Sequence, residues 1–179
     1  MGAFGNATET YSGYYDLIVT ALSANDATMA ATAETVVFGS GRPALLVPQD
    51  LPPSHYQSIM IAWDGSRVAA RAVADARDFL RLAKTVSIVV VTDEKMMLMD
   101  NPGLKLVDYL RSHDVDATIA LVQSRQRPIG RTLQDHALEN NVDMMVMGAF
   151  GHSRMRDFVI GGATTGIFRD LKLPVLLSH

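Results

Sequence analysis

Cysteine is absent from the 179-residue sequence, which excludes a disulfide framework, thiolate zinc sites and a cysteine nucleophile. The lack of cysteine also fits a reducing cytosol, so we expect a cytoplasmic protein. No uninterrupted apolar stretch approaches the roughly 18 residues that a membrane-spanning helix needs, and we expect no membrane partner. The formal net charge is −3, which provides no basic surface for a polyanion. We therefore expect no nucleic-acid partner.

Several catalytic and metal-binding motifs are missing as well. The sequence has neither the Gly-x-Ser-x-Gly elbow of many hydrolases nor the Gly-x4-Gly-Lys-(Ser/Thr) phosphate loop. Its five histidines are dispersed, and no two of them have the spacing of metal ligands. A single carboxylate such as Asp64 is weak evidence for a metal or a catalytic base. We therefore expect no metal site, no catalytic residues and no efficient enzyme.

Short apolar runs alternate with longer helical patterns between residues 58 and 179. The strands are expected at Ile59–Trp63, Val86–Val91, Ala117–Val122, Val142–Met147 and Val175–Leu177. The helices are expected at Arg67–Lys84, Leu104–His113, Pro128–Asn140 and Gly161–Leu171. This alternation predicts an α/β fold with an open parallel five-stranded sheet and right-handed crossovers. The strands are apolar throughout, which indicates helices on both faces of the sheet.

An internal repeat precedes this unit. Residues 15–19 resemble residues 142–146, and the segment Arg42–Val47 resembles the segment that ends at Leu177. Residues 15–50 therefore look like a partial β-α-β remnant of a preceding copy, which should pack on the second unit or on another chain. We divide the chain into a disordered leader (1–14), this remnant (15–50), a proline-containing linker (51–57) and a complete domain (58–179).

A glycine-rich segment between residues 147 and 165 follows a predicted strand and opens a predicted helix. Gly148 and Gly151 permit tight turns and the close approach of a ligand. Gly161 and Gly162 stand at the helix start, where free N–H groups and the helix dipole favour an anion. The alternative is that these glycines only shape a connection, and their placement alone leaves both interpretations open.

Gly148, Gly151 and Gly161 have the spacing Gly-x2-Gly-x9-Gly, while Asp64 and Val91 end the first two strands of the complete domain. In these residues, and in the closing Pro174–Leu177 strand, the chain resembles the universal stress protein family. The resemblance covers residues 58–179 fully and residues 15–48 as a C-terminal remnant of a tandem member. It implies a Rossmann-like fold of the adenine nucleotide alpha hydrolase type, and a stress-response protein that binds ATP or another adenine nucleotide, with Mg²⁺ as an optional companion.

The same resemblance implies a set of nucleotide-binding residues. Asp64 would lie near the ribose and adenine, and Val91 would line the adenine pocket. Met147 and Gly148 would lie beneath the ribose. The phosphates would meet the backbone of Gly151, Gly161, Gly162 and Ala163, and Thr164 matches a threonine common in that helix.

The sequence departs from the family's nucleotide motif at Gly162, where nucleotide-binding members carry Ser or Thr. One lost hydrogen bond, about 0.5–1.5 kcal/mol, would weaken ATP binding about tenfold. The alternative is a nucleotide-free dimeric interaction module with a structural glycine loop. Family members typically pair through their last strands, which implies a homodimer. The two such strands of this chain, Ala44–Val47 and Val175–Leu177, could instead pair within one chain.

Overall fold

The computed structural model describes residues 11–23, 26–51, 55–93, 103–149 and 162–179. Within these ranges the N-terminal segment, predicted to be a remnant at residues 15–50, comprises β1 (Ile18–Leu22), α2 (Ala27–Gly39) and β2 (Ala44–Pro48). The second unit begins with β3 (Ser58–Ala62), α3 (Arg67–Asp75), α4 (Arg77–Leu82), β4 (Thr85–Val91), α5 (Leu104–Arg111) and β5 (Thr118–Val122). It ends with α6 (Ile129–Glu139), β6 (Met144–Gly148), α7 (Gly162–Arg169) and β7 (Val175–Ser178).

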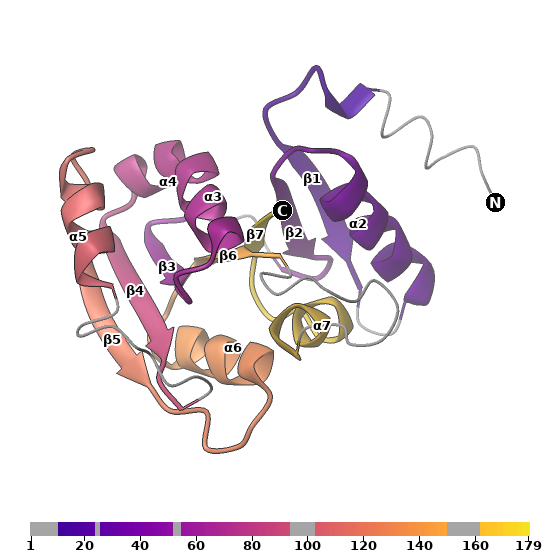
Figure 1. Cartoon of the computed structure of the whole chain (residues 1–179). Helices are drawn as coiled ribbons and strands as arrows, with labels where there is room; N and C mark the ends of the chain where they lie inside the picture. Colours follow the sequence, from indigo (N-terminus) through magenta and orange to yellow (C-terminus); the bar gives the residue numbers. More distant parts are fainter. Residues whose placement is uncertain (1–10, 24–25, 52–54, 94–102, 150–161) are drawn as a thin grey trace.

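One sheet joins both units, with the strand order β1-β2-β7-β6-β3-β4-β5 (Figure 1). Neighbouring strands are parallel, except that β2 and β7 are antiparallel. The α/β class and the parallel five-stranded part, β7-β6-β3-β4-β5, are as the sequence predicts.

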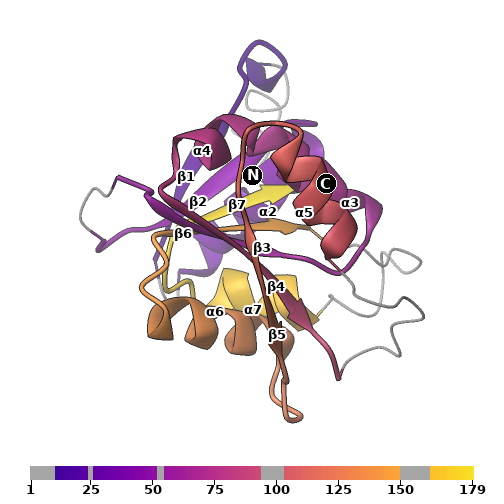
Figure 2. The same ribbon diagram turned by 90° about the vertical axis from the view of Figure 1, so that its left-hand side faces the viewer.

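Helices cover the two faces of the sheet in two groups (Figures 1 and 2). Side chains of α3, α4 and α5 form one core cluster with the strands, and side chains of α2, α6 and α7 form the other. The central strands are buried on both faces, as their uniformly apolar sequences predict. Met60 and Met145 in one cluster and Ile61 and Val146 in the other are each at most 1% exposed.

The predicted helix at Arg67–Lys84 is divided into α3 and α4 at Ala76. The N–H of Ala76 is shared between the carbonyls of Ala72 and Ala74, which tightens the backbone into a turn. The Ala76 side chain is fully buried, and Ala72 and Leu80 on either side of it belong to the same core cluster. None of the helices in the described ranges is long and apolar enough to cross a membrane.

The N-terminal segment meets the five-stranded part at β2 and β7, where Leu45 lies opposite Leu176. The two closing strands, β2 and β7, therefore pair within one chain. This is one of the two options that the sequence allows. It places β7 between β2 and β6, and β2 between β1 and β7. Neither closing strand retains an edge for a second copy, so the implied homodimer through the last strands is not available in this arrangement.

Candidate functional site

The strand order reverses between β3 and β6. From β3 the chain proceeds outward through β4 and β5, and it then returns to place β6 on the other side of β3. Ala62 lies opposite Met147 in this pair, so the carboxyl ends of the two strands coincide. Ligands of open α/β sheets bind at such a switch point, outside the carboxyl ends of the strands. This edge is the candidate site.

Asp64 lies in the turn that connects β3 to α3. Its Oδ1 accepts the N–H of Ser66 at 2.9 Å, and Gly65 between them has a φ of +73°. Ser66 caps α3, because its Oγ accepts the N–H of Ala69 at 3.2 Å. A capping bond of this kind contributes about 1 kcal/mol. Asp64 is exposed at the switch point, and it also orders the turn that begins α3.

Val91 and Met147 end two of the strands at the same edge. Val91 is half-buried at the end of β4, and Met147 is 5% exposed near the end of β6. Both pack against the core cluster that includes α6 and α7. The structure therefore brings Asp64, Val91 and Met147 to one end of the sheet.

Gly148 has a packing role that the sequence did not reveal. A Cβ at this position would lie 2.5 Å from the backbone nitrogen of Ala69 and 2.6 Å from the carbonyl carbon of Val68. The first turn of α3 therefore packs directly on the backbone of β6. Contact with α3, rather than the approach of a ligand, is sufficient to explain this glycine.

The helix predicted to meet the phosphates begins, in the described residues, at Gly162 and includes Ala163. Thr164 is 3% exposed, so its side chain belongs to the interior of the fold. Gly151 and Gly161 lie outside the described residues, and their assignment remains a prediction.

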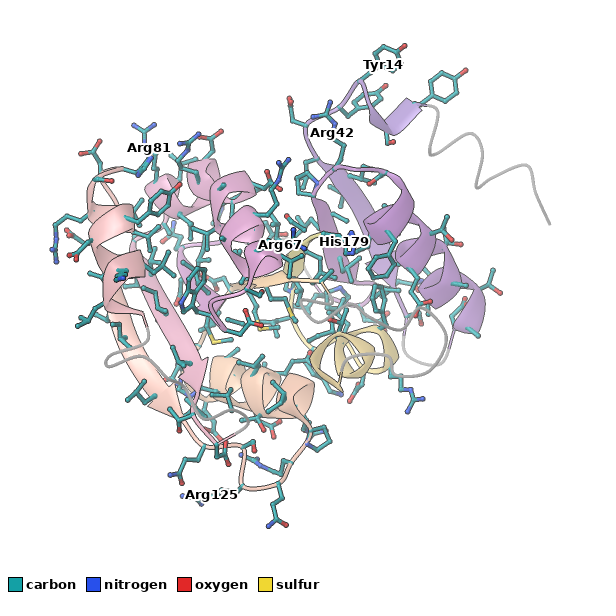
Figure 3. The ribbon with its side chains drawn as sticks, viewed as in Figure 1. Tyr14, Arg42, Arg67, Arg81, Arg125 and His179 are labelled. Atoms are coloured by element: carbon teal, nitrogen blue, oxygen red, sulfur yellow. The ribbon has the colours of Figure 1, made fainter. Side chains whose placement is uncertain are left out.

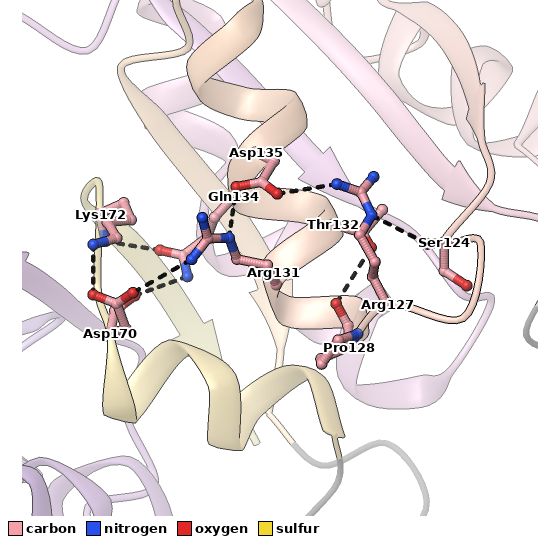
Figure 4. Close-up of polar contacts among 9 residues, drawn as sticks. All are labelled: Ser124, Arg127, Pro128, Arg131, Thr132, Gln134, Asp135, Asp170 and Lys172. Carbon is pink, nitrogen blue, oxygen red and sulfur yellow. Dashed lines mark hydrogen bonds and ion pairs between the residues drawn. The ribbon is translucent and has the colours of Figure 1, made fainter.

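A polar clamp fastens the far end of α7 to α6 (Figure 4). Gln134 is 2% exposed, and its Nε2 donates to the carbonyl of Asp170 at 2.9 Å. Its Oε1 accepts the N–H of Lys172 at 2.7 Å. Asp170 also pairs with Lys172 at 2.7 Å and with Arg131 at 3.8 Å. These contacts hold the C-terminal end of α7 on α6.

Asp93 is a further organising residue at this edge, and the sequence reasoning missed it. Its carboxylate accepts the Ser124 N–H at 2.7 Å, the Ser124 hydroxyl at 3.0 Å and the Arg125 N–H at 2.9 Å. The Ser124 N–H in particular holds the pKa of Asp93 below its ordinary value. These bonds support a loop in which Arg125 and Gln126 both have positive φ. The sequence contains one feature that could have identified Asp93. Asp93 lies two residues after the end of β4, as Asp64 lies two residues after the end of β3.

No group of His, Asp and Glu side chains suited to hold a metal occurs among the described residues. Within those residues, this edge of the sheet carries two exposed carboxylates, Asp64 and Asp93, and the apolar strand ends Val91 and Met147.

Comparison with known proteins identifies the relatives of this chain. The family model described as the universal stress protein family matches residues 55–179. The universal stress protein Slr1230 of Synechocystis is 25% identical in an alignment of 189 positions that covers 94% of this chain and 59% of the relative. The chain thus spans about three-fifths of the length of this curated relative.

Solved structures show the same fold. A universal stress protein from Archaeoglobus fulgidus matches 97% of this chain and 66% of its own, with 16% identity and a TM-score of 0.75. A universal stress protein solved in complex with cAMP matches 70% of this chain and 99% of its own, with 20% identity and a TM-score of 0.52.

Proposed function

The chain belongs to the universal stress protein family, and from that premise we propose that residues 58–179 bind an adenine nucleotide as part of a stress response. ATP is the proposed ligand, with Mg²⁺ as an optional companion. The base and ribose would lie against Asp64, Val91 and Met147. The phosphates would lie at the start of α7, where Gly151, Gly161, Gly162 and Ala163 would supply backbone N–H groups.

One observation carries this proposal: the switch point between β3 and β6 gathers an exposed carboxylate and apolar strand ends at one edge. Apolar side chains suit a base, and a carboxylate suits ribose hydroxyls, because a carboxylate accepts hydrogen bonds and a hydroxyl donates them. The structural neighbour in complex with cAMP supports an adenine nucleotide as the class of ligand.

A nucleotide-free interaction module is the second candidate function. It is favoured by Gly148, whose lack of a side chain is already required by the contact with α3. It is also favoured by Gly162, which cannot supply the hydroxyl that nucleotide-binding members place there. The two candidates predict opposite results in a binding experiment.

Nucleotide titration of the whole chain distinguishes them. Trp63 is the only tryptophan and directly precedes Asp64, so its fluorescence should report occupancy, with calorimetry as the second readout. ATP and cAMP should each be titrated with and without Mg²⁺. Saturable binding that Asp64→Ala weakens, and that Asp50→Ala leaves unchanged, is the expected result. Asp50 is a suitable control because it is also exposed but follows β2 in the remnant.

Two variants of the glycine segment complete the test. Gly161→Val is expected to abolish binding, because a branched side chain would obstruct the approach of phosphate to the backbone. Gly162→Ser is expected to strengthen ATP binding about tenfold by restoring one hydroxyl bond. If millimolar ATP and cAMP give no saturable signal with either the natural chain or Gly162→Ser, the nucleotide proposal is overturned in favour of the interaction module.

A further inference from the structure

Strand β5 is the outermost strand at the end of the sheet remote from β1, in the part of the chain that the structure describes (Figures 1 and 2). It lies within the residues that match the family model, so its edge belongs to the family domain itself. The N-terminal segment enters the sheet at β1, which is six strand intervals away, or roughly 30 Å at about 4.8 Å per interval. The outer edge of β5 is therefore far from the point where that segment joins the sheet.

The outer edge of β5 presents backbone groups with which a further strand can pair. The Val122 carbonyl accepts the Thr92 N–H at 3.0 Å, so Val122 bonds toward β4. Successive residues of a strand alternate in direction, and the N–H and C=O groups of Ile119 and Leu121 therefore point outward. Edge strands are usually protected by charges, prolines or bulges. Residues 117–123 contain neither a charged residue nor a proline.

An exposed apolar side chain stands beside this edge. Ile119 packs against the core cluster that includes α5, whereas Ala120 and Val122 pack against the cluster on the opposite face. Leu121 alternates with Ala120 and so shares the face of Ile119, but its side chain is 63% exposed. A strand placed beside β5 with an apolar residue opposite Leu121 would remove this side chain from water.

The outer edge of β5 is complementary to itself when two copies meet antiparallel. Only residues that point outward can exchange hydrogen bonds, and the register that overlaps all of Thr118–Val122 places Ile119 opposite Leu121 of the second copy. Each such pair exchanges both of its N–H···O bonds, and each Leu121 side chain is covered by an Ile119 side chain on the same face. Ala120 lies opposite its own copy at the two-fold axis, where its small side chain leaves room for the partner.

The charges at the two ends of β5 are complementary in the same arrangement. The exposed Asp116 precedes the strand and the exposed Arg125 follows it, and neither forms an ion pair with another described residue. Arg125 extends outward from the loop after β5, and Asp93 holds its backbone N–H at 2.9 Å (Figure 3). An antiparallel pair brings the acidic start of each strand beside the basic end of the other, which favours association.

We propose that two copies of this chain associate through the outer edges of their β5 strands, paired antiparallel about a two-fold axis at Ala120. The occupant is a second copy rather than an unrelated strand, because the hydrogen-bonding groups, the apolar side chains and the charges are each matched by the same edge turned end for end. The paired strands are short, so the association is weak and depends on protein concentration.

Cysteine cross-linking of the whole chain tests the register, because the natural sequence contains no cysteine. In the proposed dimer the two Ala120 Cα atoms lie about 4.5 Å apart, within the range of a disulfide, whereas the two Thr118 Cα atoms lie about 14 Å apart. Under mild oxidation, Ala120→Cys should therefore cross-link at least about tenfold faster than Thr118→Cys. A mixture of Thr118→Cys and Val122→Cys should cross-link faster than either variant alone, because Thr118 lies opposite Val122.

Two exposed leucines provide a matched control for the interface. Leu121→Lys should slow the cross-linking of Ala120→Cys about tenfold, because a lysine at a strand edge opposes pairing. It should also abolish the concentration-dependent dimer of the natural chain in sedimentation equilibrium. Leu138→Lys, which changes a leucine of α6 that is 49% exposed, should do neither.

Three outcomes would overturn the proposal. The first is that Ala120→Cys cross-links no faster than Thr118→Cys, or that Leu121→Lys and Leu138→Lys give the same result. The second is that the natural chain remains monomeric at millimolar concentration. The third is slow amide hydrogen exchange at Leu121 in the dilute monomer, because the protein's own chain would then cover the edge of β5.

Discussion

Substitution of Gly148 by alanine tests whether this glycine serves packing or ligand binding. The new Cβ would lie 2.5 Å, 2.6 Å and 2.7 Å from Ala69 N, Val68 C and Val68 Cγ2. Two of these atoms belong to the backbone of α3, so no side-chain rotation relieves the overlap. The helix must move away from the sheet by about 1 Å, and such overpacking costs about 1–3 kcal/mol. We expect the upper part of that range.

The matched control is Gly65→Ala. Gly65 has a φ of +73°, and a Cβ there would have no atom of the described residues within 4 Å. Its cost is therefore conformational only, about 1–2 kcal/mol. For a chain of this size, each kcal/mol of destabilisation lowers Tm by about 2–4 °C. A cost of about 2–3 kcal/mol for Gly148→Ala should therefore lower Tm by about 4–12 °C, and Gly65→Ala should lower it by less.

Thermal and urea unfolding of the nucleotide-free chain measures both variants. The expected order is that Gly148→Ala is less stable than Gly65→Ala, which is less stable than the natural chain. If Gly148→Ala is as stable as the natural chain but no longer binds nucleotide, the packing explanation is refuted. Gly148 would then be assigned to the nucleotide-binding site. The reverse substitution, Ala21→Gly in β1, is a second control. Because Ala21 is exposed, the loss of its side chain should lower the free energy of unfolding by no more than about 1 kcal/mol.

Three further predictions concern polar groups away from Gly148. Ser178 Oγ is buried with no hydrogen-bond partner among the described residues, so Ser178→Ala should raise Tm by about 2–4 °C. The control is Ser124→Ala, which removes a hydroxyl bonded to Asp93 and should lower Tm. Gln134→Ala should lower the free energy of unfolding by about 2–4 kcal/mol, because it leaves the Asp170 carbonyl and the Lys172 N–H without their Gln134 bonds. Urea unfolding measures the loss. A change below about 0.5 kcal/mol would show that Gln134 does not fasten α7 to α6. Asp93 has a lowered pKa in the folded chain, so its stabilisation is present above the ordinary carboxyl pKa and is lost as the pH falls through the lowered value. Asp93→Asn should therefore reduce the loss of stability on acidification, and an unchanged acid limb in urea unfolding would show that Asp93 does not contribute to it.

Most of the fold could be predicted because its strands are short, apolar and separated by clear helix signals. The order of elements and the position of each strand follow from local patterns, to within one or two residues at their ends. The division at Ala76 could not be predicted, because alanine favours a continuous helix. The antiparallel pairing of β2 with β7 could not be decided for a different reason. A repeat identifies two equivalent strands, but not whether they meet in the same chain.

The site was less accessible to sequence reasoning than the fold. The position of Asp64 and Val91 at one edge follows from the order of parallel strands, whose carboxyl ends coincide. Asp93 was missed because a carboxylate after a strand looks the same whether it faces a ligand or supports a neighbouring loop. The packing role of Gly148 was hidden because a sequence does not reveal how closely a helix approaches a strand.

The explanation of Gly148 changes which residues can test nucleotide binding. A Gly148 variant would disturb the contact between α3 and β6, and with it the turn that contains Asp64. A loss of nucleotide binding could then result either from the lost glycine or from the displaced turn. Asp64→Ala has a related difficulty, because the Asp64 carboxylate accepts the N–H of Ser66 and orders the turn before α3. Gly162 is a better position, because it begins a helix whose other end is held on α6 by Gln134. A gain of affinity in Gly162→Ser is the most informative single result, because loss of folding cannot produce it.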